Sequence, residues 1–197
     1  MERFVGGVHP LTIPPDAVVP QRHKDAPAPG HEIASHYRNC FGCGQDHPTG
    51  LHIAITASEG LRITSEFEVT EHHQGAPGIA HGGLLALAFD ESLSATNWLI
   101  RVPAVTAHLE VSYRMPVPVG TRVFINAEII AVKGRKMWSR AEGHLNTPDG
   151  PVGVGAEALF MQVSLEHFEK YGRAEDLQVA ATDPRVLDHI AGLDIAP

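Results

Sequence analysis

The 197-residue chain is long enough for one well-filled hydrophobic core with substantial tails. Its hydrophobic content of 43% and the lack of an apolar run of membrane-spanning length favour a soluble globular protein with no membrane partner. A formal net charge of −8 disfavours nucleic acid as the main partner, because no net cationic field attracts phosphates. The N-terminal residues lack the charged, apolar and small-residue regions of a secretory signal, so we expect a cytoplasmic location.

The first half of the chain combines an irregular arm with two strands and a long helix. Residues 1–35 hold six of the fifteen prolines and show no sustained period, which predicts an extended N-terminal arm. Strand patterns follow at residues 51–56 and 61–69. A tight loop at residues 75–78 then precedes residues 82–100, whose pattern predicts one helix of about five turns.

The second half consists of strand patterns followed by an acidic tail. We predict four strands in a meander, at residues 104–115, 121–132, 136–145 and 151–163. A single long helix among mostly antiparallel strands must bury its apolar face against the sheet. We therefore predict an α+β domain over residues 36–164, with the sheet wrapped round one central helix. Residues 165–197 carry seven acidic and three basic side chains and predict a short helical tail.

The predicted helix has two different faces. Leu85, Phe89 and Leu93 form an apolar stripe that should face the sheet. A second stripe, small and polar, suits contact with a second helix or a cavity. It comprises Gly83, Leu87, Asp90, Ser94 and Asn97. On pattern alone Asp90 is either an exposed or a functional carboxylate, whereas Glu91 points about 100° away and is predicted to be solvated or structural.

The helix begins with a glycine pair directly after a histidine. The first N–H groups of a helix lack intrahelical partners, and glycine lets a ligand oxygen approach them closely. Gly82 and Gly83 could therefore donate to a polarised carbonyl as an oxyanion-type site. A tight loop-to-helix turn explains the same glycines without a ligand, and His81 could bond loop backbone.

Two segments resemble the hotdog-fold acyl-CoA thioesterases of the phenylacetate-degradation (PaaI) type. They are HQGAPGIAHGGLLALAFDESL (residues 73–93) and VTAHLEVSYRMPVPVG (residues 105–120). The resemblance includes CFGCG…PTGL before the first strand and covers roughly residues 38–164. It implies a hotdog fold and hydrolysis of an acyl-CoA to free acid and coenzyme A, without a metal or redox cofactor.

The resemblance also implies roles for individual residues. Asp90 matches the carboxylate that activates water or attacks the thioester carbon, and the N–H of Gly82 matches the donor that polarises the thioester carbonyl. Thr106 matches the hydroxyl that helps to hold the attacking water. His81 is a further candidate catalytic residue, without an assigned role as base. The candidate substrate-binding residues are Gly83, Gln74, Ser112, Arg114, Gly134, Arg135 and Lys136.

Two features bear on how the substrate would be held. Many relatives carry Asn where this chain has Gly75, so the neighbouring Gln74 is the candidate substitute.

Coenzyme A is strongly anionic, and an acidic protein needs a local cluster of basic side chains, a cationic mouth, to bind it. The densest cationic candidates are Arg114, Lys133, Arg135, Lys136 and Arg140, which also fit an ordinary solvated turn. Tyr113 and Trp138 could stack on adenine, but core packing is favoured for both.

Other readings of the chain stay open. The same fold could hydrate or dehydrate acyl thioesters with His81 and Asp90 as acid and base, or act as a non-catalytic acyl-CoA sensor. The presence of the Asp90 carboxylate favours an enzyme over a sensor.

The segment Cys40-x-x-Cys43, with His36 and His47 nearby, has partial zinc-ligand spacing. A second Cys-x-x-Cys is absent, so we predict packing thiols in a turn and no metal.

The spacing of the glycine pair and Asp90 predicts that an active site needs two chains. Gly82 and Asp90 are eight residues apart on one helix, which separates their backbones by about 12 Å along its axis. Reacting groups must lie about 3 Å from a shared substrate atom. We therefore expect a homodimer in which Gly82 of one chain faces Asp90 of the other, with a dimer of dimers left open.

Overall fold

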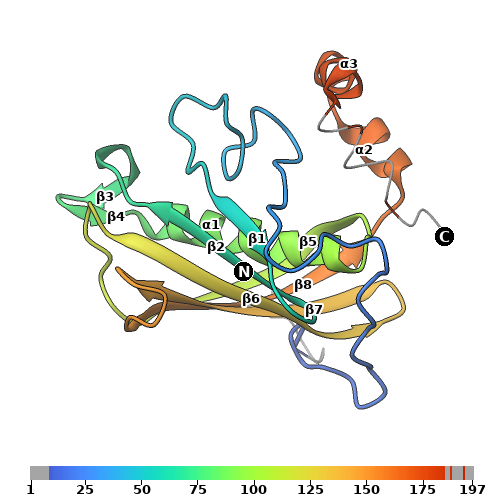
Figure 1. Ribbon diagram of the computed structural model, residues 1–197, viewed down its shortest axis with the longest axis horizontal. Coiled ribbons are helices and arrows are strands. Elements are labelled where there is room, and N and C mark those ends of the chain that lie inside the picture. Colours follow the sequence, from blue (N-terminus) through green and yellow to red (C-terminus); the bar gives the residue numbers. More distant parts are fainter. Residues whose placement is uncertain (1–8, 185–186, 188–192, 194–197) are drawn as a thin grey trace, which may run out of the picture.

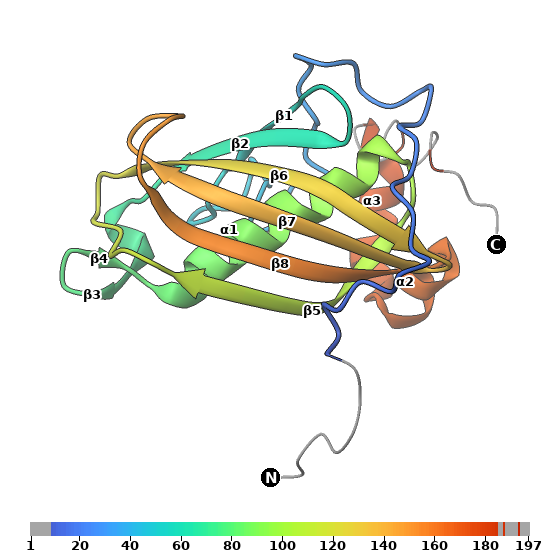
Figure 2. The same cartoon turned by 90° about the horizontal axis from the view of Figure 1, so that it is seen from below.

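The computed structural model describes residues 9–184, 187 and 193, and its main feature is a six-stranded antiparallel sheet. The strands are β1 (Ala54–Ala57), β2 (Arg62–Glu68), β5 (Ala104–Tyr113), β6 (Arg122–Lys133), β7 (Lys136–Leu145) and β8 (Val152–Gln162). They lie in the order β1-β2-β6-β7-β8-β5 (Figure 2). A short 3-10 turn, η1 (Glu71–His73), leads into a separate hairpin of β3 (Gln74–Ala76) and β4 (Ile79–Ala80).

One central helix lies across a single face of this sheet. α1 (Gly82–Ala95) continues into a 3-10 turn, η2 (Thr96–Leu99), so the predicted helix is confirmed except that its last turn tightens. Leu85, Phe89 and Leu93 are all at most 4% exposed, which confirms the stripe predicted to face the sheet. Figure 2 shows α1 crossing behind the strands, and the predicted α+β architecture is therefore confirmed.

The predicted four-strand meander is correct for β6, β7 and β8 and wrong for β5. β5 pairs with β8, with Tyr113 opposite Val154, and forms an edge of the sheet. The connection from β5 to β6 contains Pro116 and Pro118 and is too long for a tight hairpin turn. Its backbone pairs with the β3–β4 hairpin instead, through Ala80 N–H to Val117 O at 2.9 Å, and then enters the sheet beside β2.

The N-terminal arm packs along the sheet on the side away from α1. Val18 pairs with Val132 at the end of β6, and the indole Nε1 of Trp138 donates to Pro10 O at 3.0 Å. Leu11 packs on the same small apolar cluster. Trp138 is only 2% exposed, so it takes the packing role rather than the adenine-stacking one.

Two short helices form the described part of the acidic tail. α2 (Leu165–Tyr171) and α3 (Ala174–Thr182) follow β8 and contain no buried residues. Figure 1 shows them projecting to one side of the sheet. The helical tail is confirmed up to α3, and much of residues 185–197 lies outside the described residues. Among the residues described, none of the helices is long and apolar enough to cross a membrane.

Candidate active site

Asp90 lies against β5, at the edge of the sheet. The hydroxyl of Thr106 donates to Asp90 Oδ1 at 2.7 Å. A bulge in β5 makes this contact possible, because it puts Thr106 and His108, two residues apart, opposite the adjacent residues Phe160 and Leu159 of β8. Thr106 therefore faces α1 and His108 faces away from it. Partial burial raises the pKa of Asp90, and the Thr106 hydroxyl partly offsets this effect.

The N-terminus of α1 offers one free backbone donor. His81 is the N-cap, and its Nδ1 accepts the N–H of Gly83 at 2.9 Å. The N–H of Gly82 has no hydrogen-bond partner among the described residues. Gly82, rather than Gly83, is thus the group that can donate to a substrate oxygen. Because Nδ1 of His81 is an acceptor, the neutral ring carries its proton on Nε2.

A shallow hollow of about 310 Å³ opens beside this helix end. Its lining consists of Ile79, Ala80, Gly82, Leu85, Tyr113, Arg114, Met115, Pro116 and Val117. The Tyr113 hydroxyl donates to Gly82 O at 2.8 Å, and its side chain is 52% exposed. The structure thus brings the predicted residues Gly82 and Arg114 together and adds Tyr113, which we expected in the core. Its alternation with Leu109 and Val111 places it on the helix side of β5.

Gln74 and Gly75 have structural roles in the loop before α1. Gln74 Oε1 accepts from Gly78 N–H at 2.6 Å, and its Nε2 donates to Glu71 O at 3.0 Å. A Cβ on Gly75 would lie 2.7 Å from Cα of His81, so no side chain fits there. The side chain that relatives use at this position therefore has no counterpart, and the Gln74 amide is occupied within the hairpin.

The other predicted substrate contacts do not join Asp90 or Gly82 within one chain. Ser112 faces the opposite side of the sheet, in a wide hollow that it lines together with Arg114. Gly134, Arg135 and Lys136 form the tight turn between β6 and β7, where Arg135 Nε donates to Gln162 O at 2.9 Å.

The predicted cationic mouth is divided among separate ion pairs. Arg114 lies 3.6 Å from Glu142, Arg140 lies 2.6 Å from Glu128, and Lys133 lies 2.6 Å from Asp16. These carboxylates offset much of the positive charge. A concentrated basic patch is thus not formed by these residues within one chain.

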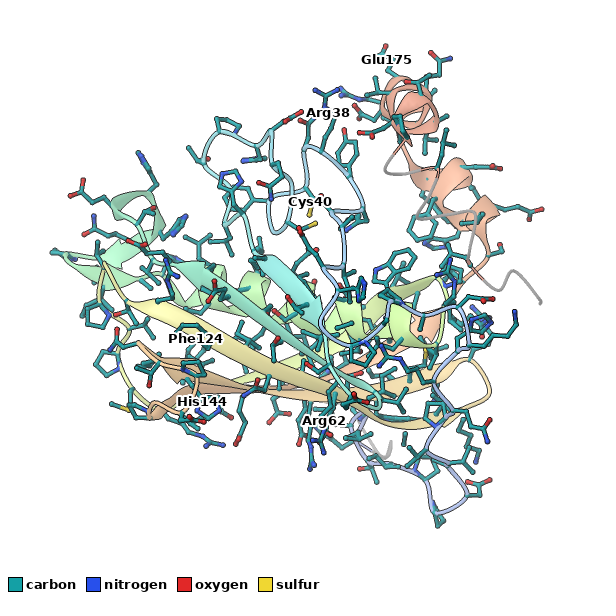
Figure 3. The ribbon with its side chains drawn as sticks, in the orientation of Figure 1. Arg38, Cys40, Arg62, Phe124, His144 and Glu175 are labelled. Atoms are coloured by element: carbon teal, nitrogen blue, oxygen red, sulfur yellow. The ribbon has the colours of Figure 1, made fainter. Side chains whose placement is uncertain are left out.

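The Cys-x-x-Cys segment packs against α1 next to Asp90. His36, Cys40 and Cys43 converge on Glu91, whereas His47 stacks on Phe41 instead. The Glu91 side chain is 12% exposed, so the structural reading of Glu91 is correct and the solvated one is wrong. Figure 3 shows Cys40 and the sulfur atoms on the helix side of the sheet, with the labelled Arg62 and His144 on the other side.

The polar stripe of α1 is only partly available to a second chain. Asn97 is 5% exposed and lies inside its own chain, in η2. Leu87 and Ser94 are half-buried, and Gly83 is exposed. The stripe as predicted is therefore too long, and the part that remains accessible runs from the start of α1 to Ser94.

Comparison with known proteins identifies the domain. Residues 77–149 match the family model described as the thioesterase superfamily. The chain is 28% identical over 102 residues to the acyl-coenzyme A thioesterase THEM4 of Xenopus laevis, covering 52% of this chain and 46% of that protein. It is 28% identical over 100 residues to human THEM5, covering 51% of this chain and 40% of that protein. The matched region thus spans less than half the length of these curated relatives.

Solved structures show the same fold. A crystal structure of a thioesterase superfamily protein aligns with a TM-score of 0.59 and 25% identity, over 71% of this chain and 70% of that one. PaaI of E. coli aligns with a TM-score of 0.54 and 14% identity, over 58% and 81%. A Streptococcus pneumoniae thioesterase protein with coenzyme A aligns at 0.53 and 14%, over 56% and 88%.

The fold is the hotdog fold that thioesterase superfamily structures share. In particular, residues 77–149, which contain α1, β5, β6 and β7, match the thioesterase superfamily model, in agreement with the resemblance to PaaI-type proteins.

Proposed function

We propose that this protein is an acyl-CoA thioesterase. The observation that carries the proposal is the pairing of two half-sites on α1, a hydrogen-bonded carboxylate and a free N–H donor. Asp90, oriented by Thr106, activates a water molecule or attacks the thioester carbon itself. The N–H of Gly82 donates to no other group among the described residues and stabilises the oxyanion that forms. The C–S bond then breaks, and coenzyme A leaves as a thiolate that takes up a proton.

The two half-sites of each reaction centre belong to different copies of the chain. Asp90 is bonded to Thr106 near the start of β5, and Gly82 is bonded to Tyr113 at its end. Among the described residues β5 is an edge strand with one unpaired side, which can pair with its own copy. An antiparallel pairing centred near Leu109 and Glu110 places Thr106 opposite Tyr113 of the partner subunit. Asp90 then lies near the N–H of Gly82 of the partner subunit, and a two-fold axis generates two equivalent sites.

The same pairing supports a role for Arg114 in binding the anionic part of coenzyme A, because Arg114 borders the hollow beside Gly82. Ser112 and the turn at Gly134, Arg135 and Lys136 are proposed contacts for more distant parts of the nucleotide. The Streptococcus pneumoniae neighbour was solved with coenzyme A, and binding of coenzyme A by this chain is part of the proposal.

The structure favours hydrolysis over hydration of an acyl thioester. A hydratase of this kind needs a histidine that accepts a proton. The Nδ1 lone pair of His81 is used in capping α1, and the other ring nitrogen carries the proton. His81 is thus suited to positioning the glycine pair rather than to general-base catalysis.

A hydrolysis screen tests the proposal. Release of free thiol should be followed with a colourimetric reagent across short, medium, long and aryl-acyl CoA esters. We expect turnover on at least one ester well above the rate in buffer, without added metal or redox cofactor. A rate equal to that of buffer on every ester, with binding of acyl-CoA retained, would instead identify a sensor.

A further inference from the structure

We propose that His36, Cys40, Cys43 and Glu91 form a structural zinc site that fastens the cysteine loop (residues 35–50) to α1. One ligand atom from each of these four residues lies within 4.8 Å of every other. The site is separate from the reaction centre and goes beyond the proposed hydrolysis. Glu91 comes from a part of the sequence about fifty residues from the cysteines, so the four ligands meet only in the folded chain.

The distances between the ligand atoms fit a tetrahedral ion. Cys40 Sγ lies 3.3 Å from Glu91 Oε2, Cys43 Sγ lies 3.4 Å from His36 Nδ1, and His36 Nδ1 lies 3.5 Å from Glu91 Oε1. Zinc bonds of about 2.3 Å to sulfur and about 2.0 Å to nitrogen or oxygen place tetrahedral ligands about 3.3–3.8 Å apart. These three separations lie in that range, and the remaining pairs of ligand atoms lie within 4.8 Å of each other.

The charges of the cluster call for a cation. The cluster joins two thiols, a carboxylate and an imidazole, and Cys43 and Glu91 are little exposed. A divalent cation bound there would displace the thiol protons and offset the negative charge of the thiolates and the carboxylate.

The loop is shaped for close approach to α1. A Cβ on Gly42 would lie 2.6 Å from Glu91 Oε2, so glycine lets the loop backbone approach the carboxylate without displacing it. Gly44 N–H donates to Cys40 O at 2.9 Å and closes the turn that presents both sulfurs. Ser35 Oγ lies 3.3 Å from Cys43 Sγ, within hydrogen-bonding distance, and helps to orient this sulfur.

The donor set selects the metal and its role. Two thiolates exclude the oxygen-preferring ions Mg²⁺ and Ca²⁺, and a mixed sulfur, nitrogen and oxygen set fits Zn²⁺. Four protein ligands fill the tetrahedral shell and leave no position for water, as in a structural site. Because Glu91 follows Asp90 directly, the ion would hold the helix segment that carries the proposed catalytic carboxylate.

Metal content of the untagged full-length protein, purified with reduced thiols, tests the proposal. We expect about one zinc per chain after reconstitution and a melting temperature at least about 5 °C lower after chelation. Replacement of zinc by Co²⁺ should give a thiolate charge-transfer band and the intense visible bands of tetrahedral cobalt. Less than about 0.1 zinc per chain, or isolation of Cys40 and Cys43 as a disulfide that persists during reconstitution in reductant, would overturn it.

Variants assign the ion to this cluster. Cys40→Ser with Cys43→Ser should abolish binding, and Glu91→Gln, which is nearly isosteric, should weaken zinc affinity at least about 10-fold while the chain stays folded by circular dichroism. His47→Asn in the same loop and His108→Asn in the exposed group of His9, His108 and Glu110 are matched controls that should retain the ion. Zinc that survives loss of both cysteines, or that is lost in the His108 control, would contradict the assignment. These readouts do not depend on hydrolysis, so failure here leaves the proposed function intact.

Discussion

Asp90 and Glu91 are neighbours on α1, but their carboxylates have different partners. Asp90 accepts a hydrogen bond from Thr106 on the edge strand, at the surface of the chain. Glu91 lies beneath the cysteine loop, close to His36 and Cys40. The difference follows from the 100° turn between successive helical residues. We propose that the Asp90 carboxylate meets a substrate, whereas the Glu91 carboxylate meets the loop.

At the residue scale, Asp90→Asn should lower kcat by about 10²–10⁴-fold, because the amide can neither take a proton from water nor attack the thioester. Steady-state hydrolysis of the best CoA ester measures this, with circular dichroism to check the fold. Glu91→Gln in zinc-saturated protein is the comparison and should retain much more activity. If Glu91→Gln proves the more damaging substitution, the assignment of roles to the two carboxylates is incorrect.

Single residues were predictable from the sequence where local spacing defines them. The positions of Asp90 and Gly82 on one helix follow from periodicity, and their proposed roles follow from the resemblance. The meeting of Glu91 with Cys40 and Cys43 was not predictable, because the loop joins the helix across about fifty residues of chain. Tyr113 was also missed, since alternation alone does not say which strand becomes the exposed edge.

At the scale of the helix, the first residue of α1 can be replaced by proline without altering the geometry of the helix. His81 has φ −69° and ψ 129°, the extended conformation that a residue before proline requires. Proline is also tolerated at the first helical position. Gly82→Pro therefore removes the N–H donor and leaves the helix in place.

We expect Gly82→Pro to lower kcat by about 10²–10³-fold, the usual effect of losing one oxyanion donor. Gly82→Ala is the matched control: it keeps the N–H, and its Cβ would meet the Tyr113 ring at an ordinary 3.4–3.6 Å. Single-turnover hydrolysis separates the chemical step from binding. Similar rates for the proline and alanine variants would show that the Gly82 N–H does not stabilise the oxyanion.

The turn between β6 and β7 gives a prediction about substrate binding. Arg135→Ala with Lys136→Ala should raise KM for acyl-CoA more than it lowers kcat, since contacts remote from the thioester bind substrate and transition state alike. A small thioester without the nucleotide should be hardly affected. Lys24→Ala with Lys170→Ala makes the same change in net charge at exposed positions and is the control. An equal loss on both substrates would argue against a coenzyme-binding turn.

Elements were predictable to different degrees. α1 and the strands β6, β7 and β8 follow from periodicity and turn residues, because each is set by local sequence. The place of β5 depends on a connection that pairs with the β3–β4 hairpin, a long-range contact without a local signal. The bulge that turns Thr106 toward α1 also breaks the simple alternation of β5.

At the scale of the whole molecule, one chain carries the two proposed half-sites, and the residues that the structure describes leave the β5 edge of the sheet unpaired. The N-terminal arm approaches the other edge, where Glu32 pairs with Thr56 of β1. β5 has ten residues and, within the described part of the chain, pairs on one side only. Pairing of β5 with its copy would cover Thr106 and complete each site with the N–H of Gly82 of the partner subunit. On this basis we propose a homodimer that binds acyl-CoA between its chains.

Activity of mixed dimers is the most direct test of this shared site. Gly82→Pro chains and Asp90→Asn chains, each inactive and folded alone, should be unfolded together, refolded at equal amounts and examined by native mass spectrometry. A mixed dimer places both lesions in one site and leaves the other whole, so it should recover about half of wild-type activity. Random exchange makes about half of the dimers mixed, which predicts about a quarter of wild-type activity overall. Mixed dimers that are abundant but inactive would contradict a site built from Gly82 of one chain and Asp90 of the other.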